Sequence, residues 1–237
     1  MPDPEVTDEQ IVETLRGIGR SIHAREPDAD ACAAIAGHLA AVQALLDDGE
    51  PRRRWYEMPP EDRDNRRFYR QLSTFSGRLN TIAPPIVITS GSMPDGAPAL
   101  IGAVRLDRRY EGPPRAVHGG ILAGLFDELL GGGQRLTGGP PGMTGRLTVR
   151  YRRPTPLDTD LQFRAWIADE RERRVTVKAD CRVLTHGARD GEADDAAPPT
   201  AEAEAIFLRV DYDGLERVLR EREDGAAPAP APRVEPS

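Results

Sequence analysis

One stretch, His118 to Gly133 (HGGILAGLFDELLGGG), constrains the fold more than any other part of the chain. Its apolar residues recur at helical spacing, yet it contains six glycines and an acid, Asp127, near its middle. Glycine inside a helix costs about 1 kcal/mol relative to alanine. At 3.6 residues per turn, one narrow stripe of the helix carries Gly120, Gly124, Asp127 and Gly131. The sequence therefore predicts a central helix whose carboxylate lies in a groove without side chains.

The same stretch predicts a second chemical group at its N-terminal end. The first amides of a helix have no partner within the helix and carry partial positive charge. His118-Gly119-Gly120 lies where the helix should begin, so its amides can polarise a carbonyl oxygen. Taken singly, the HGG segment can be a loop, and Asp127 can pair with an arginine. The glycine stripe favours a ligand site, whereas Glu128 lies about 100° off the stripe and is expected to be structural or interfacial.

Segments typical of β-strands lie on both sides of this helix. Before it come residues 86–90 and 100–106, and after it come 142–153, 161–169, 174–184 and 201–210. In the first of the later segments, strict alternation predicts Met143, Gly145 and Leu147 on one face. It predicts Thr144 and Arg146 on the other face. Two strands, one helix and four strands indicate an α+β fold in which the sheet curls round the helix.

The rest of the chain divides by composition and periodicity. Residues 1–50 are predicted to form an N-terminal helical pair, with a capping box at Thr7 and Gln10 and a break at residues 26–28. Residues 51–74 predict an irregular connector, and residues 75–211 form the main domain. Residues 185–200 predict a polar loop, and residues 212–237 a short helix (213–223) followed by a disordered Pro/Ala-rich tail.

Composition excludes several classes of function. The net charge of −7 argues against a nucleic-acid partner. The two cysteines make no disulfide framework, and no cysteine and histidine spacing indicates a metal site. The N-terminus has no apolar signal core, and no run is expected to reach the roughly 18 apolar residues of a membrane span. A cytoplasmic location is the expectation.

Two segments together resemble a known family. AVHGGILAGLFDELLG, with an acid nine residues after the histidine, and the later GMTGRLTVRYRRPTPL resemble the hotdog-fold acyl-CoA thioesterases of the PaaI-like and THEM4-like group. The resemblance covers about residues 75–211. It implies a hotdog fold, in which a curled antiparallel sheet wraps a central helix. It also implies subunits that pair edge to edge as a homodimer or a dimer of dimers, with active sites at the interface.

The resemblance also implies roles for individual residues. Asp127 would be the general base or nucleophile, the amide of Gly119 or Gly120 would polarise the thioester carbonyl, and His118 would shape that end. Thr144 occupies the position of an assisting threonine. In GRLNTIAPP (77–85), Asn80 could enter the site from the connector or could be a turn residue. Arg150, Arg152 and Arg153 are candidate contacts to the phosphates of coenzyme A, although a solvated strand face is the favoured explanation in a chain so rich in arginine.

Acyl-CoA thioester hydrolysis, a step of fatty acid metabolism, is the leading function. It needs a water, a carboxylate and an oxyanion site, so no metal or cofactor is expected, coenzyme A being part of the substrate. Two alternatives stay open. A hydratase or dehydratase would act on acyl-CoA through a differently arranged Asp/His pair, and a non-catalytic sensor would bind acyl-CoA without cleaving it. The sequence contains no GxSxG motif for a serine hydrolase.

Overall fold

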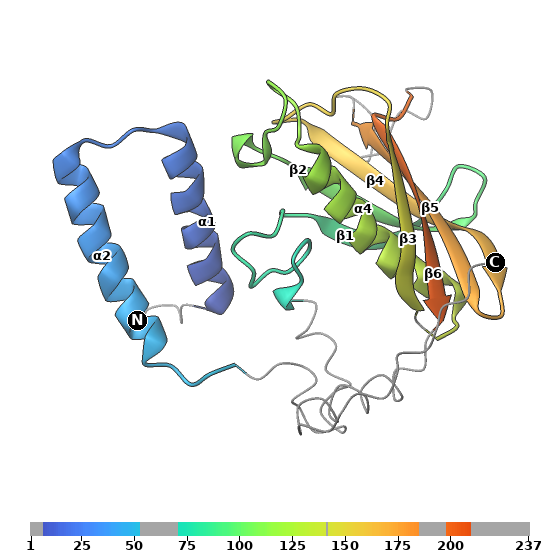
Figure 1. The fold of residues 1–237 in the computed structure, drawn as a ribbon, viewed down its shortest axis with the longest axis horizontal. Helices are drawn as coiled ribbons and strands as arrows, with labels where there is room; N and C mark the ends of the chain where they lie inside the picture. The colour runs from blue at the N-terminus through green and yellow to red at the C-terminus, as the bar shows by residue number, and fades with distance from the viewer. Residues whose placement is uncertain (1–6, 53–70, 141, 185–197, 210–237) are drawn as a thin grey trace, which may run out of the picture.

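A computed structural model describes residues 7–52, 71–140, 142–184 and 198–209 of the 237-residue chain. Within these ranges the main domain is a six-stranded antiparallel sheet around one long helix (Figure 1). Its strands run in the order β1-β2-β4-β5-β6-β3. The strands are β1 (Val87–Ser92), β2 (Pro98–Arg105), β3 (Gly142–Tyr151), β4 (Asp160–Arg171), β5 (Arg174–Val183) and β6 (Ala201–Arg209). Several predicted segments lie partly or wholly outside the described residues: residues 53–70 of the connector, residues 185–197 of the loop predicted at 185–200, and the helix and tail at 212–237.

The central helix, α4 (Gly119–Gly133), has the bounds that the sequence predicts, with His118 as its N-cap. Its buried apolar side chains pack against the concave side of the sheet. The rings of Phe126 and Phe163 meet edge to face with their centroids 5.1 Å apart. Such a core stabilises the fold mainly because apolar area leaves water. A sheet wrapped round one helix is the hotdog architecture, so the predicted α+β fold is confirmed.

Two short 3-10 helices flank α4. The first, η3 (Arg108–Tyr110), precedes it, and the second, η4 (Gln134–Thr137), continues directly from its last residue. The second one turns the chain toward β3. Gln134 is buried there. Its side-chain amide donates to the Gly142 carbonyl and accepts the Gly142 amide. The start of β3 is thereby fixed against the end of α4.

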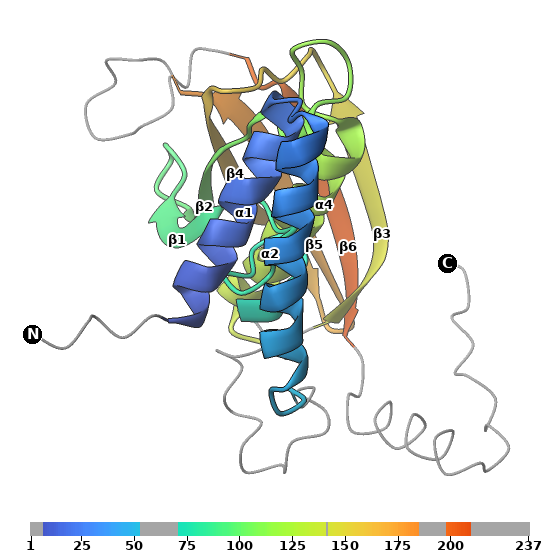
Figure 2. The same cartoon turned by 90° about the vertical axis from the view of Figure 1, so that its left-hand side faces the viewer.

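The N-terminal region forms the expected pair of helices, α1 (Asp8–Ala24) and α2 (Ala29–Asp47). The capping box of Thr7 and Gln10 is present, and Asp28 caps α2. Figures 1 and 2 show the pair beside the hotdog unit, with α1 nearer to it. Arg16 of α1 donates to the carbonyls of Gly77 and Asn80 at 2.9 and 2.8 Å, which attaches α1 to the connector.

The helix α2 has no buried residue. It carries no charged side chain between Asp30 and Asp47, and it is long and apolar enough by length and composition to cross a bilayer. The expectation that no run reaches this length was therefore wrong. Core helices of soluble proteins meet the same criterion, so the finding does not by itself establish a span.

Candidate active site

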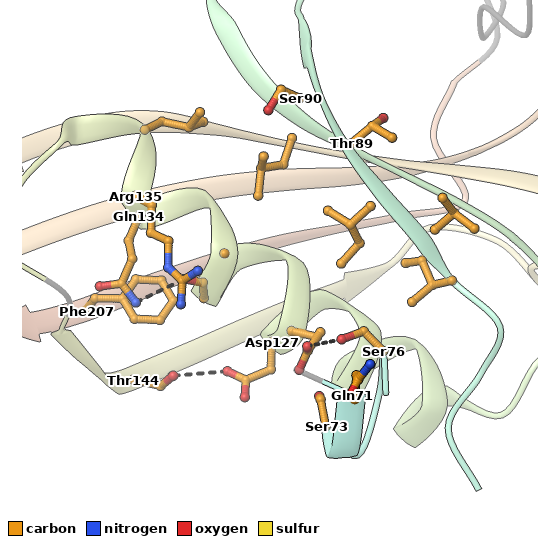
Figure 3. A pocket seen from close by; sticks show the side chains of 18 of the residues that line it. Gln71, Ser73, Ser76, Thr89, Ser90, Asp127, Gln134, Arg135, Thr144 and Phe207 are labelled. Carbon is orange, nitrogen blue, oxygen red and sulfur yellow. Dashed lines mark hydrogen bonds between the residues drawn. The ribbon is translucent and has the colours of Figure 1, made fainter. Parts of the chain in front are cut away.

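A cleft of about 1280 Å³ runs along the second half of α4 (Figure 3). One wall comes from β1 and β2, another from the starts of β3 and η4, and a third from the connector. Its apolar lining is Ile86, Val87, Ile88, Leu100, Leu136, Met143 and Phe207. Its polar lining is Glu9, Gln71, Ser73, Ser76, Arg78, Thr89, Ser90, Asp127, Glu128, Gln134, Arg135 and Thr144. The cleft thus combines apolar and polar side chains in its lining.

Asp127 and Thr144 come together in this cleft. The Thr144 hydroxyl donates to Asp127 Oδ1 over 3.1 Å. In the described part of the chain, Asp127 Oδ2 has no hydrogen-bond partner. Asp127 is exposed to solvent in the single chain.

A β-bulge brings Thr144 to this position. Thr144 lies opposite Phe207 of β6, whereas Arg146 already lies opposite Ile206, so one residue is inserted at Gly145. Residues opposite each other in a sheet point to the same face. Phe207 points to the core, and Thr144 therefore faces α4. The predicted alternation, which placed Thr144 with Arg146 on the face away from Leu147, was wrong because it left no room for the inserted residue.

The glycine stripe has one occupant that the sequence did not indicate. A Cβ at Gly124 would lie 2.0 Å from Phe75 Cζ, so the Phe75 ring of the connector fills the groove at that point. The ligand site that the stripe predicts therefore does not extend over Gly124. Beside it, Ser76 of the connector donates its hydroxyl to Glu128. This bond is consistent with the structural role expected for Glu128.

The N-terminal end of α4 forms a separate group of residues. His118 Nδ1 accepts the Gly120 amide at 3.0 Å, and the Tyr151 hydroxyl donates to the Gly119 carbonyl at 2.8 Å. The peptide between Gly119 and Gly120 is therefore bonded on both sides. Among the described residues nothing accepts the Gly119 amide, which makes Gly119 a better candidate than Gly120 for polarising a carbonyl.

The two ends of the candidate site are far apart in one chain. Gly119 and Asp127 are eight residues apart in α4, which corresponds to about 12 Å along the helix axis. His118, Gly119 and Gly120 do not line the cleft that contains Asp127. One chain alone therefore cannot bring both groups to the same carbonyl.

Four other predicted residues lie outside the cleft: Asn80, Arg150, Arg152 and Arg153. The amide group of Asn80 donates to the carbonyls of Leu72 and Ser73, and its Oδ1 accepts the Ile82 amide. Of the two roles that the sequence leaves open for Asn80, these bonds support the turn residue. Arg152 pairs with Glu202, and Arg153 follows it just beyond β3. Both follow Tyr151, so they belong to the Gly119 end of the helix.

A curled sheet around one helix, with a carboxylate at mid-helix and an open amide at its N-terminus, defines a hotdog-fold domain with a candidate ligand cleft. Residues 115–189 match the model of the thioesterase superfamily. The resemblance to the hotdog-fold thioesterases that the sequence predicts is therefore confirmed over this segment.

Three known proteins illustrate what this chain is similar to. The acyl-coenzyme A thioesterase THEM4 of Xenopus laevis is 34% identical over 101 residues. The match covers 42% of this chain and only 40% of that relative. A crystal structure of a thioesterase superfamily protein aligns with a TM-score of 0.65 at 25% identity, covering 86% of this chain and 96% of the other. The PaaI protein of the E. coli phenylacetic acid degradation operon aligns at 14% identity with a TM-score of 0.42, over 52% of this chain and 80% of its own.

Proposed function

We propose that this protein hydrolyses the thioester of an acyl-CoA to a free acid and coenzyme A. The observation that carries the proposal is the Asp127 carboxylate held by the Thr144 hydroxyl inside a cleft with apolar and polar walls. The similarity to a relative named as an acyl-coenzyme A thioesterase supports the same reaction.

The chemistry proposed for Asp127 is that of a general base. Thr144 holds Oδ1, so Oδ2 is left to accept a proton from a water molecule as the water oxygen attacks the thioester carbonyl carbon. The oxyanion that forms accepts a hydrogen bond from a helix N-terminal amide. The carbon–sulfur bond then breaks, and the proton on Asp127 passes to the thiolate of coenzyme A. Direct attack by the carboxylate is the alternative form of this step.

The amide and the carboxylate in this proposal belong to different subunits. The distance of about 12 Å between Gly119 and Asp127 along one helix supports this division. The edge strand β3 supports a homodimer, because an unpaired edge is a template for pairing with another strand. Met143 and Tyr151 near its two ends are exposed by 48% and 54%. A second copy aligned antiparallel along β3 would bring its Gly119 end toward Asp127.

The test uses purified protein, a panel of acyl-CoA substrates and a thiol reagent that reports free coenzyme A. All variants carry Cys32→Ser, because the exposed Cys32 thiol would react with the reagent. We expect thiol release by the parent and at least a tenfold loss in Asp127→Asn, in line with the contribution of a catalytic base. The matched control is Asp95→Asn, an exposed aspartate in the turn between β1 and β2, which should keep full activity.

Three outcomes would contradict parts of the proposal. Equal rates in the parent and Asp127→Asn would reject the role of Asp127. Binding of acyl-CoA without thiol release from any substrate would favour a sensor. Hydration of an unsaturated acyl-CoA without thiol release would favour a hydratase.

A further inference from the structure

The three glycines that end α4 differ in what surrounds them. A Cβ at Gly132 would lie 2.9 Å from Leu100 Cδ1, and one at Gly133 would lie 3.0 Å from Val177 Cγ1. Packing against the sheet therefore leaves little room for a side chain at either position. At Gly131, no described atom lies within 4 Å of the Cβ position. A side chain at residue 131 would enter open space, so packing does not explain this glycine.

Helix stability does not explain Gly131 either. Glycine is the least stable residue in a helix interior after proline, and alanine or leucine at the same position would stabilise α4. Gly131 lines the cleft and follows Asp127 by four residues, which places the two on the same face of the helix one turn apart. What a side chain at residue 131 would change is the space in the cleft.

The walls of the cleft near Gly131 include apolar side chains of the sheet, together with the polar side chains of Gln134 and Arg135. Leu100 lies against the adjacent Gly132, and Ile88 of the neighbouring strand β1 lines the same side. Figure 3 shows Phe207 next to Thr144 on the opposite side of the cleft. An apolar chain leaving a carbonyl at Asp127 would therefore run past Gly131 between these walls.

We propose that Gly131 sets the length of the acyl group that this protein accepts, an inference that rests on the proposed thioesterase function. Its missing side chain keeps open a channel for an unbranched aliphatic chain longer than one helical turn, about 5.4 Å. The substrates are then acyl-CoAs with extended aliphatic chains, and acetyl-CoA does not use this part of the cleft.

The test compares Gly131→Leu with Gly37→Leu. Leucine is a strong helix former, so neither variant should unfold. Gly37 lies inside α2 with no described atom near its Cβ position and does not line the cleft, so it controls for the change in helix propensity. We expect kcat/KM of Gly131→Leu to fall at least tenfold on long-chain acyl-CoA and to change less than twofold on acetyl-CoA. Gly37→Leu should keep the chain-length profile of the parent, and neither midpoint of thermal unfolding should fall.

An unchanged profile in Gly131→Leu, or the same change in Gly37→Leu, would overturn the inference and leave the proposed function intact. If the parent releases no thiol from any substrate, the proposed function fails, and titration calorimetry with non-hydrolysable thioether analogues of acyl-CoA decides about Gly131. Loss of binding in Gly131→Leu confined to the long-chain analogue would support its role in the cleft. Equal binding of that analogue by the parent and the variant would reject it.

Discussion

Thr144 reaches Asp127 because the strand that carries it contains one residue too many for regular alternation. The hydroxyl lies 3.1 Å from Asp127 Oδ1, and the inserted residue is Gly145. Bulges bend a strand and redirect side chains, and they are frequent beside active sites. The pairing of a helix carboxylate with a strand hydroxyl thus depends on the register between β3 and β6.

Removal of the Thr144 hydroxyl is expected to weaken hydrolysis. A hydrogen bond to a charged group is worth about 1.5–3 kcal/mol. Thr144→Val, which keeps the shape of the side chain, should therefore lower kcat by about ten- to a hundredfold. Thr144→Ser keeps a hydroxyl and should lie within a few-fold of the parent. Steady-state kinetics on one acyl-CoA measure both, and a valine variant as active as the serine variant would remove Thr144 from the mechanism.

Gln134 is expected to act on the same pair through the backbone. Its Nε2 donates to the carbonyls of Gly131 and Gly142, each at 3.1 Å, and its Oε1 accepts the Gly142 amide at 2.6 Å. Gly142 lies two residues before Thr144. These bonds therefore fix the start of β3, and with it the position of the Thr144 hydroxyl.

The variant Gln134→Met fills a similar volume and removes all three bonds. It leaves buried polar groups of Gly142 unpaired, at about 1–3 kcal/mol for each group. The free energy of unfolding, measured in urea, should fall by that order, and kcat should fall while KM stays near its original value. Gln134→Glu keeps the acceptor for the Gly142 amide and should retain more of the stability. A methionine variant as stable as the parent would show that the three hydrogen bonds of Gln134 do not hold Gly142 in place.

The features predicted from sequence are those encoded by neighbouring residues. The helix from Gly119, capped by His118, follows from spacing within one turn, as does the capping box at Thr7. The bulge at Gly145 depends on how β3 pairs with β6, and these strands are more than fifty residues apart in the chain. Local alternation therefore could not reveal the direction of Thr144.

The contact between Gly124 and Phe75 could not be predicted either, because the two residues are far apart in the sequence. The glycine stripe predicts that something approaches α4 closely, and it does not say what. The aromatic side chains of the connector were recognisable, but their partners lie far along the chain. The sequence left the role of Asn80 open because asparagine suits turns and sites equally well, and its bonds in the structure support the turn.

Phe75 and Gly124 are expected to be energetically coupled. A methyl group in Gly124→Ala would overlap the Phe75 ring and force it out of the groove. This loss should outweigh the gain of about 1 kcal/mol from replacing a helix glycine by alanine. In Phe75→Ala the groove is empty, so adding Gly124→Ala should then be neutral or stabilising. A double-mutant cycle of unfolding free energies measures the coupling, and additive effects would show that the ring does not occupy the groove.

The two cysteines are expected to differ sharply in reactivity. Burial raises the pKa of the Cys181 thiol to about 12, and its side chain is fully buried in the core. The thiolate is the reactive form, so Cys181 stays protonated and inert at any pH where the fold is stable. Cys32, near the start of α2, is exposed.

An aromatic disulfide reagent at pH 8 should therefore label one thiol per native chain and two per chain in denaturant. In Cys32→Ser, native labelling should drop to nothing, whereas Cys181→Ser should keep the fast single label. Rapid labelling of Cys181 in the folded Cys32→Ser variant would mean that the core beneath β5 opens to solvent, contrary to the packing of this face of the sheet against α4.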